Sequence, residues 1–216
     1  MLPKPGRNRL FAGALGLLLS LTLAAPATAD MAQLGPNNYV AGVPTQEFLH
    51  FAAPEGKGRQ QMENWCWAAC VQMVLNYHGL YVTQEEIVRR VYGAAVDRPA
   101  NPAQIMAALT GWAPDIRGKR SAIYADPYHI DPLTVINDLD HRWPLIVGLA
   151  APQPGVQGHA YVLTGAYFYL DANQQPIIYR VILRDPYPTR DSRVEMSMEE
   201  FGQRLQFASR VYVERL

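Results

Sequence analysis

The sequence predicts an α+β protein, with helices in the first half of the chain and antiparallel strands in the second half. Between residues 64 and 142, helix start signals recur and apolar residues follow a helical spacing. From residue 145 onward, short runs rich in β-branched and aromatic residues alternate with turn residues. Helices and strands that are segregated in this way indicate a helical lobe packed on a sheet.

The first 29 residues are expected to be a signal peptide. Three basic residues lie within the first ten positions, an apolar run follows from Leu10 to Ala25, and Ala27-Thr28-Ala29 is a small-x-small cleavage site. The apolar run is short for a membrane span, so an uncleaved anchor is the less favoured alternative. We therefore expect export to the periplasm or the extracellular space, with no membrane association after cleavage.

Composition excludes some partners of the mature chain. The full chain of 216 residues has 19 basic and 19 acidic residues, and removal of residues 1–29 leaves 16 against 19, a net charge of −3. This balance gives no basic surface for nucleic acid or for an anionic membrane. The remaining chain of roughly 187 residues is long enough for one domain, expected at 58–216 and expected to be a monomer.

Residues 30–57 are expected to form an irregular N-terminal segment, either a propeptide or a strap. Proline, glycine and asparagine interrupt this segment, and only the stretches YVAGV and EFLHF could be short strands.

Four helices are expected next. The first spans 64–79, with Asn64 as its N-cap and Gly79 as its stop. The others begin at a capping box or at a cap followed by proline, and they cover about 83–93, 101–111 and 131–142.

Strands are expected at 145–150, 160–170 and 177–184, and residues 171–176 should form a hairpin turn between the last two. Another capping box at 197–200 opens a short helix to about residue 205, and the stretch ASRVYVERL closes the chain as a strand.

Cys66 and Cys70 are the only cysteines of the chain. On a helix, residues four apart have nearly parallel Cβ vectors, which suits a disulfide badly. Cys66 lies in the first turn, where free N–H groups and the helix dipole favour a reactive thiolate, but it could also be an apolar filler. Cys70 is expected to be buried and inert. No second cysteine pair exists, so neither a metal nor another cofactor is expected.

A cysteine nucleophile needs a base, and His159 is the strongest candidate among five histidines. A glycine-flanked loop delivers it to the start of a long strand, whereas His78 and His141 lie near helix ends where a positive charge is welcome. Asp185 ends the next strand, so pairing through the hairpin should bring it beside His159. The alternative is that Asp185-Pro186 only starts a turn.

Three stretches carry a resemblance to a known family. In order, NWCWAA after a glutamine, GHAYVLTGAYF and VILRDPYP resemble the papain-like cysteine peptidases, and more narrowly a secreted bacterial branch with a WCWAA motif and a Cys-His-Asp triad. The resemblance covers about residues 58–190. It implies a papain-like fold, with the nucleophile helix packed on a C-terminal antiparallel sheet.

The resemblance also implies roles for individual residues. Cys66 would be the nucleophile, His159 the general base and then the general acid, and Asp185 the residue that orients His159, where many members have asparagine. The family has an oxyanion-hole glutamine, commonly six residues before the cysteine, which selects Gln60 and leaves Gln61 as the alternative.

Trp65 and Trp67 depart from the small residues that flank the cysteine in plant members of the superfamily. They could wall the cleft or pack the lobes together. The implied function is hydrolysis of peptide bonds in a peptide or protein substrate through a Cys66 thioester. Two alternatives stay open: acyl transfer, transamidation or deamidation by the same triad, and a non-catalytic binding protein with a papain fold.

Overall fold

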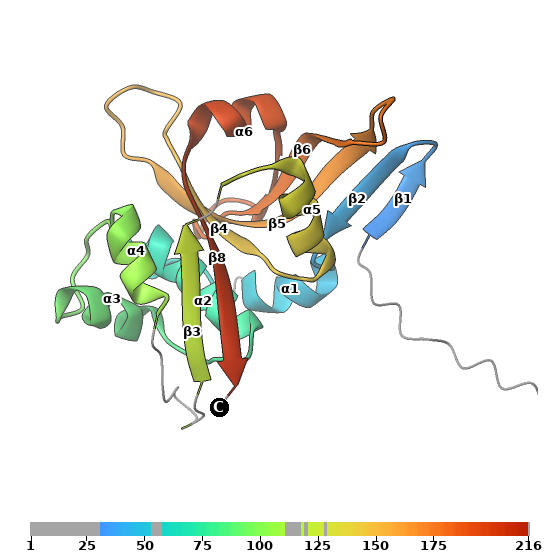
Figure 1. Cartoon of the computed structure of the whole chain (residues 1–216). Coiled ribbons are helices and arrows are strands. Elements are labelled where there is room, and N and C mark those ends of the chain that lie inside the picture. Colours follow the sequence, from blue (N-terminus) through green and yellow to red (C-terminus); the bar gives the residue numbers. More distant parts are fainter. Residues whose placement is uncertain (1–30, 53–57, 111–117, 119–120, 128, 216) are drawn as a thin grey trace, which may run out of the picture.

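A computed structural model describes residues 31–52, 58–110, 118, 121–127 and 129–215 (Figure 1). The expected signal peptide therefore lies outside the described residues. Within the described ranges, no helix has the length and apolar character needed to cross a membrane.

One antiparallel sheet of eight strands organises the described part of the chain. The strands are β1 (Met31–Gly35), β2 (Asn38–Gly42), β3 (Ser121–Pro127), β4 (Leu145–Leu149), β5 (His159–Leu170), β6 (Pro176–Arg184), β7 (Arg193–Ser197) and β8 (Leu205–Arg215). The strand order is β1-β2-β5-β4-β8-β3. Strand β5 pairs with β2 and β4 and also with β6, and β6 pairs in turn with β7.

Helices cover both faces of this sheet (Figure 1). They are α1 (Thr45–Ala52), α2 (Cys66–Tyr77), α3 (Gln84–Tyr92), α4 (Pro102–Ala108), α5 (Pro132–Asp140) and α6 (Met198–Arg204). One core places α1 to α4 against Ile146 and Val162, and the other places α5 and α6 against Leu145 and Leu163. Successive strand residues point to opposite faces, which explains why neighbours serve different cores. The predicted α+β papain-like class is confirmed.

Helix α2 is the most buried helix, and every residue from Cys66 to Leu75 is inaccessible or nearly so. Its N-cap lies one residue later than the predicted Asn64. Trp65 is its N-cap, while the backbone N–H of Asn64 donates to Asp97 Oδ1 at 2.8 Å. The other predicted helix starts are confirmed: the side chains of four capping residues accept backbone N–H groups at the starts of α3, α4, α5 and α6.

The expectation of an irregular N-terminal segment is wrong for residues 31–52. They form the β1–β2 hairpin and α1, so EFLHF is helical, whereas YVAGV is the predicted strand. Strand β2 adds to the central sheet beside β5, and Tyr39 stacks on Phe168 with ring centroids 5.3 Å apart. The partner strand of β2 lies more than 120 residues away in the chain, so the residues of 31–52 alone do not reveal this pairing.

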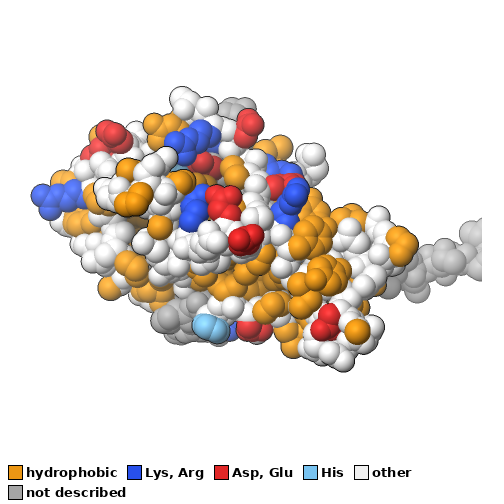
Figure 2. All heavy atoms as spheres, turned by 90° about the horizontal axis from the view of Figure 1, so that it is seen from above, with side chains coloured by type: hydrophobic (Ala, Val, Ile, Leu, Met, Phe, Trp, Pro, Cys, Tyr) orange, Lys and Arg blue, Asp and Glu red, His pale blue; other side chains and the backbone are white. Residues whose placement is uncertain are grey.

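Figure 2 shows the face that is seen from above Figure 1. Hydrophobic side chains gather toward the end of the molecule formed by β1 and β2, while basic and acidic side chains mix over the rest of this face. The exposed hydrophobic residues of these strands and the β5–β6 hairpin are Met31, Leu34, Tyr169, Ile177 and Tyr179.

Candidate active site

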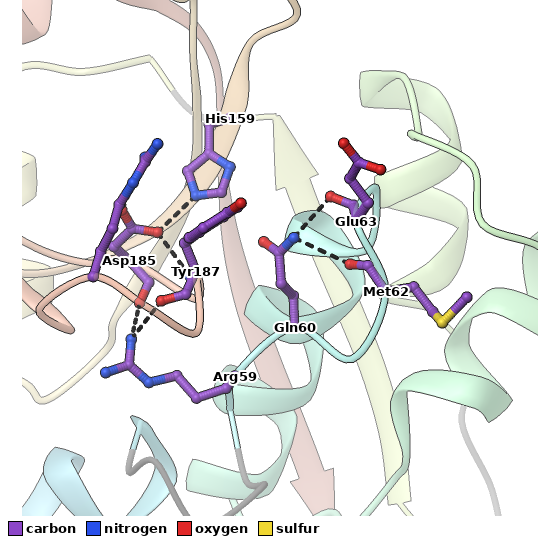
Figure 3. A network of polar contacts seen from close by, with 8 residues as sticks. Arg59, Gln60, Met62, Glu63, His159, Asp185 and Tyr187 are labelled. Atoms are coloured by element: carbon purple, nitrogen blue, oxygen red, sulfur yellow. Dashed lines mark hydrogen bonds and ion pairs between the residues drawn. The ribbon is translucent and has the colours of Figure 1, made fainter.

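His159 and Asp185 form a close pair at one end of β5 and β6. His159 is the first residue of β5 and Asp185 follows the last residue of β6; the register pairs Val162 with Arg184. His159 Nε2 lies 2.7 Å from Asp185 Oδ1 (Figure 3). The Asp185 carboxylate is almost fully buried and also accepts the backbone N–H of Tyr187 at 2.8 Å. The structure thus brings together the two residues that the hairpin argument paired.

The environment of the pair favours the charged forms of both side chains. Burial lowers the pKa of His159, but hydrogen bonds and negative charge from Asp185 and Cys66 more than compensate and raise it to about 9. Burial raises the pKa of Asp185, yet the His159 and Tyr187 hydrogen bonds lower it overall. At neutral pH the pair is therefore an imidazolium beside a carboxylate.

Cys66 is the first residue of α2 and lines a cavity together with His159. Only 7 % of Cys66 is exposed. Since Nε2 of His159 is bonded to Asp185, Nδ1 is the ring nitrogen left to interact with Cys66. The cavity has a volume of about 570 Å³ including its open mouth, and its other walls include Trp67, Pro99, Leu149, Gly158 and Phe207.

Cys70 lies one turn further along α2 and is fully buried, as predicted. Burial first, and then the nearby charges of Cys66 and Asp185, raise the pKa of the Cys70 thiol well above its usual value. Cys70 therefore stays protonated and packs in the core. Both cysteines are free thiols, and the described residues contain no cluster of His, Cys, Asp and Glu that could hold a metal.

The two candidate glutamines differ clearly in position. Gln60 is buried, and Figure 3 shows its amide between the Met62–Glu63 turn and the side of the site that carries His159. Its Nε2 donates to Met62 O at 3.1 Å and to Glu63 O at 2.7 Å, while its Oε1 is buried without a hydrogen-bond partner. Gln61 is exposed. Of the two, only Gln60 is buried.

The two tryptophans hydrogen-bond the start of α2 to the segment of residues 96–98. Trp65 Nε1 donates to Val96 O at 2.9 Å, and Trp67 Nε1 donates to Arg98 O at 3.0 Å. Both side chains are buried, and Trp67 also lines the Cys66 cavity. The segment that they hold leads directly into Pro99, which also lines the cavity. Trp67 is thus both a cavity wall and a packing residue, whereas Trp65 only packs.

Arg59 and Tyr187 support the site, and sequence reasoning missed both. Arg59 Nη1 donates to the carbonyl oxygens of Asp185 at 2.9 Å and Tyr187 at 3.1 Å (Figure 3). The Tyr187 ring lies 6.4 Å from the His159 ring, between centroids. Arg59 immediately precedes Gln60, so the same short segment approaches the loop after β6 and supplies the glutamine. In the sequence, the only indication of a role for Arg59 is its position next to Gln60, a candidate oxyanion donor.

Comparison with known protein families identifies the chain. Residues 52–206 match the family model described as papain-like cysteine protease AvrRpt2. The chain belongs to this papain-like cysteine protease family. The matched range contains α2, β5 and the end of β6, which are the elements that carry Cys66, His159 and Asp185.

A solved cathepsin structure agrees with this protease family at the level of the fold. A procathepsin B (S9) from Trypanosoma congolense is 10 % identical over 84 % of this chain and 78 % of its own, with a TM-score of 0.50. The peptidase domain of ComA from Streptococcus, a bifunctional ABC transporter, is 18 % identical over 73 % of this chain and 96 % of its own, with a TM-score of 0.48. A search of curated proteins gives no significant match.

Proposed function

We propose that the chain is an exported cysteine peptidase that hydrolyses peptide bonds through a thioester on Cys66. Membership of the family indicates a cysteine peptidase. The observation that supports this assignment of roles is the 2.7 Å contact between His159 Nε2 and Asp185 Oδ1, because it leaves Nδ1 for the thiol of Cys66. Export rests on the predicted signal peptide.

Acylation begins from a Cys66 thiolate beside the His159 imidazolium. The thiolate attacks the carbonyl carbon of the substrate, and His159 Nδ1 donates its proton to the leaving amine as the C–N bond breaks. A water molecule then gives its proton to Nδ1 and attacks the thioester, which releases the acid and regenerates the thiolate. Throughout, Asp185 keeps the Nε2–H in place and stabilises the imidazolium.

Two groups are the proposed donors to the developing oxyanion. The backbone N–H of Cys66 is among the first N–H groups of α2, which have no partner within the helix. The second donor is Gln60 Nε2, which now donates to two carbonyl oxygens. To reach the oxyanion, it would release the longer bond, the 3.1 Å contact with Met62 O. An oxyanion-hole donor of this kind contributes about 2.7–4 kcal/mol.

The test compares Cys66→Ala with Cys70→Ala in the mature protein. Hydrolysis of casein is measured under reducing conditions, and products are identified by mass spectrometry. We expect wild type and Cys70→Ala to release new peptide termini and Cys66→Ala to release none. Equal activity in wild type and Cys66→Ala would refute the proposal. Cross-linked or ligated products in place of free termini would instead show that an amine accepts the acyl group.

Export has a separate test. The full chain is expressed in a Gram-negative host, and the N-terminus of the protein recovered outside the cytoplasm is sequenced. We expect it to begin at Asp30. Recovery of the intact chain from the cytoplasm alone would contradict export but would leave the peptidase assignment standing.

A further inference from the structure

Gln84 is the first residue of α3, and its side-chain amide is completely buried. The two residues that follow it on the helix, Glu85 and Glu86, are exposed. A buried amide costs free energy unless its donors and its acceptor are bonded, and an apolar side chain would fill the same space without that cost. The hydrogen bonds of Gln84 therefore indicate what its amide does.

The Gln84 amide binds the backbone on both sides of Gln60. Its Nε2 donates to Arg59 O at 2.7 Å, and its Oε1 accepts the backbone N–H of Gln61 at 3.0 Å. One side chain thus pairs with the residue before Gln60 and with the residue after it. This contact at two points fixes the path of the backbone through Gln60.

The same amide is joined to α2, the helix that begins with Cys66. Gln84 Nε2 also donates to Gln72 Oε1 at 2.9 Å, and Gln72 Nε2 donates to Val82 O at 3.1 Å. Gln72 lies on α2 and is buried as well. These bonds use both donor positions of the Gln84 amide and its acceptor. A buried network that is bonded in this way holds its members rigidly, so the backbone around Gln60 is fixed relative to α2.

The loop after β6 holds the same segment independently. The backbone N–H of Gln60 donates to Pro186 O at 2.9 Å, and Arg59 Nη1 donates to Asp185 O at 2.9 Å (Figure 3). The segment therefore has two separate attachments, and the one through Gln84 leads to α2. Loss of the Gln84 contacts would leave the attachment to the loop after β6 in place but would release the segment from α2.

We propose that Gln84 is a positioning residue of the oxyanion hole. Because it binds the backbone on both sides of Gln60 and joins it to α2, it sets where the Gln60 amide lies relative to Cys66. This role rests on the proposed function, in which Gln60 Nε2 stabilises the oxyanion. A displacement of about 1 Å in such a group can lower the rate about 10²-fold.

The experiment combines substitutions of Gln84 and Gln60 in one cycle. Gln84→Glu keeps the shape and the acceptor oxygen, but it can donate at most one hydrogen bond, and only when protonated. We expect kcat on a peptide substrate to fall about 10–100-fold with little change in KM. In the Gln60→Ala background the same substitution should change kcat by less than about threefold, because no amide remains to be positioned.

Two controls separate positioning from general damage. Gln203→Glu makes the same change at an exposed residue of α6 and should keep wild-type kcat. Alkylation of Cys66 by iodoacetamide needs the thiolate but no oxyanion hole, so its rate in Gln84→Glu should stay within about twofold of wild type. An equal loss of kcat in both Gln60 backgrounds, or a matching loss in the alkylation rate, would overturn the proposal.

A nuclear magnetic resonance measurement needs neither peptidase activity nor a buried carboxylate. Gln84→Met has a similar size and no charge, and it removes all three bonds of the Gln84 amide. The side-chain amide signals of Gln60, assigned by their absence in Gln60→Ala, should shift in Gln84→Met and stay in place in Gln203→Glu. Unchanged Gln60 signals in Gln84→Met would overturn the positioning role. A wild type that hydrolyses no substrate would instead refute the proposed function, and the shift would still show whether Gln84 positions Gln60.

Discussion

Helix α2 has a histidine near each end, and the two histidines carry different charges at neutral pH. At its N-terminal end Cys66 faces His159, whose pKa is raised to about 9. At its C-terminal end His78 caps the helix, and burial lowers its pKa to about 4. His159 has a carboxylate partner at 2.7 Å, whereas His78 Nε2 is buried without any partner.

The difference shows that the partner of a histidine, more than its place on the helix, sets its charge. A cation at a helix C-terminus gains about 0.3–1 kcal/mol from the dipole. The shift of His78 from 6.5 to about 4 corresponds to about 3 kcal/mol in the opposite direction. The expectation that His78 lies where a positive charge is welcome is therefore wrong, because burial outweighs the dipole.

The largest expected effect distinguishes the two histidines directly. His159→Gln should lower kcat/KM by about 10³–10⁴-fold, because it removes the group that moves protons in both half-reactions. His78→Gln should stay within a few-fold of wild type, since His78 lies at the far end of α2. Steady-state kinetics on one peptide substrate measures both variants. A comparable loss in the two variants would mean that the ends of α2 are not functionally separate.

The second largest expected effect comes from Gln60, the proposed side-chain donor to the oxyanion. Gln60→Ala should lower kcat by about 10²–10³-fold with little change in KM, because the donor acts mainly on the transition state. Gln61→Ala is the matched control, and we expect it to keep wild-type kcat because Gln61 is exposed. Thermal melting confirms that both variants fold. An unchanged kcat in folded Gln60→Ala would remove Gln60 from the oxyanion hole.

The pH profile tests the carboxylate partner of His159. Loss of the imidazolium proton should close the active range on the alkaline side near pH 9 in wild type. Asp185→Asn can still accept the hydrogen bond but carries no charge, so the alkaline limb should move down toward the usual 6.5 of histidine. We also expect kcat/KM at the optimum to fall, because a neutral amide stabilises the imidazolium less than a carboxylate does. An alkaline limb that does not move would show that the charge of Asp185 does not hold the proton.

The catalytic residues could be predicted from the sequence more completely than the strands and contacts around them. The pairing of His159 with Asp185 was predictable, because one hairpin connects their strands and fixes their register. The choice between Gln60 and Gln61 was not, because it depends on which side chain turns inward after Arg59. The role of Trp65 was equally hidden, since its partner is a backbone carbonyl of residue 96.

Local signals explain which elements were found. The capping residues of α3 to α6 act over three residues, so their pattern is visible in sequence. Strands β1 and β7 lie at ends of the sheet and are only five residues long. Each pairs with the strand next to it in the chain, β1 with β2 and β7 with β6, but neither carries the run of β-branched and aromatic residues that marks the central strands.

Acid unfolding tests whether His78 is neutral in the folded protein. Its folded-state pKa lies below the usual value, so the unfolded chain binds a proton first as pH falls. Stability from this residue is complete above pH 6.5 and declines to about pH 4, by up to about 3 kcal/mol. Urea unfolding across this range should show a weaker pH dependence in His78→Gln than in wild type. Parallel curves would contradict the buried neutral state.

The smallest expected effect separates the two tryptophans at the N-terminal end of α2. Trp65→Phe and Trp67→Phe each remove one hydrogen bond to the 96–98 segment, so each should lower the free energy of unfolding by about 1–2 kcal/mol. Trp67 also lines the Cys66 cavity, so only Trp67→Phe should change KM, by a few-fold. Urea unfolding and steady-state kinetics measure the two effects independently. An equal change of KM in Trp65→Phe would mean that the segment, and not the indole of Trp67, shapes the cavity.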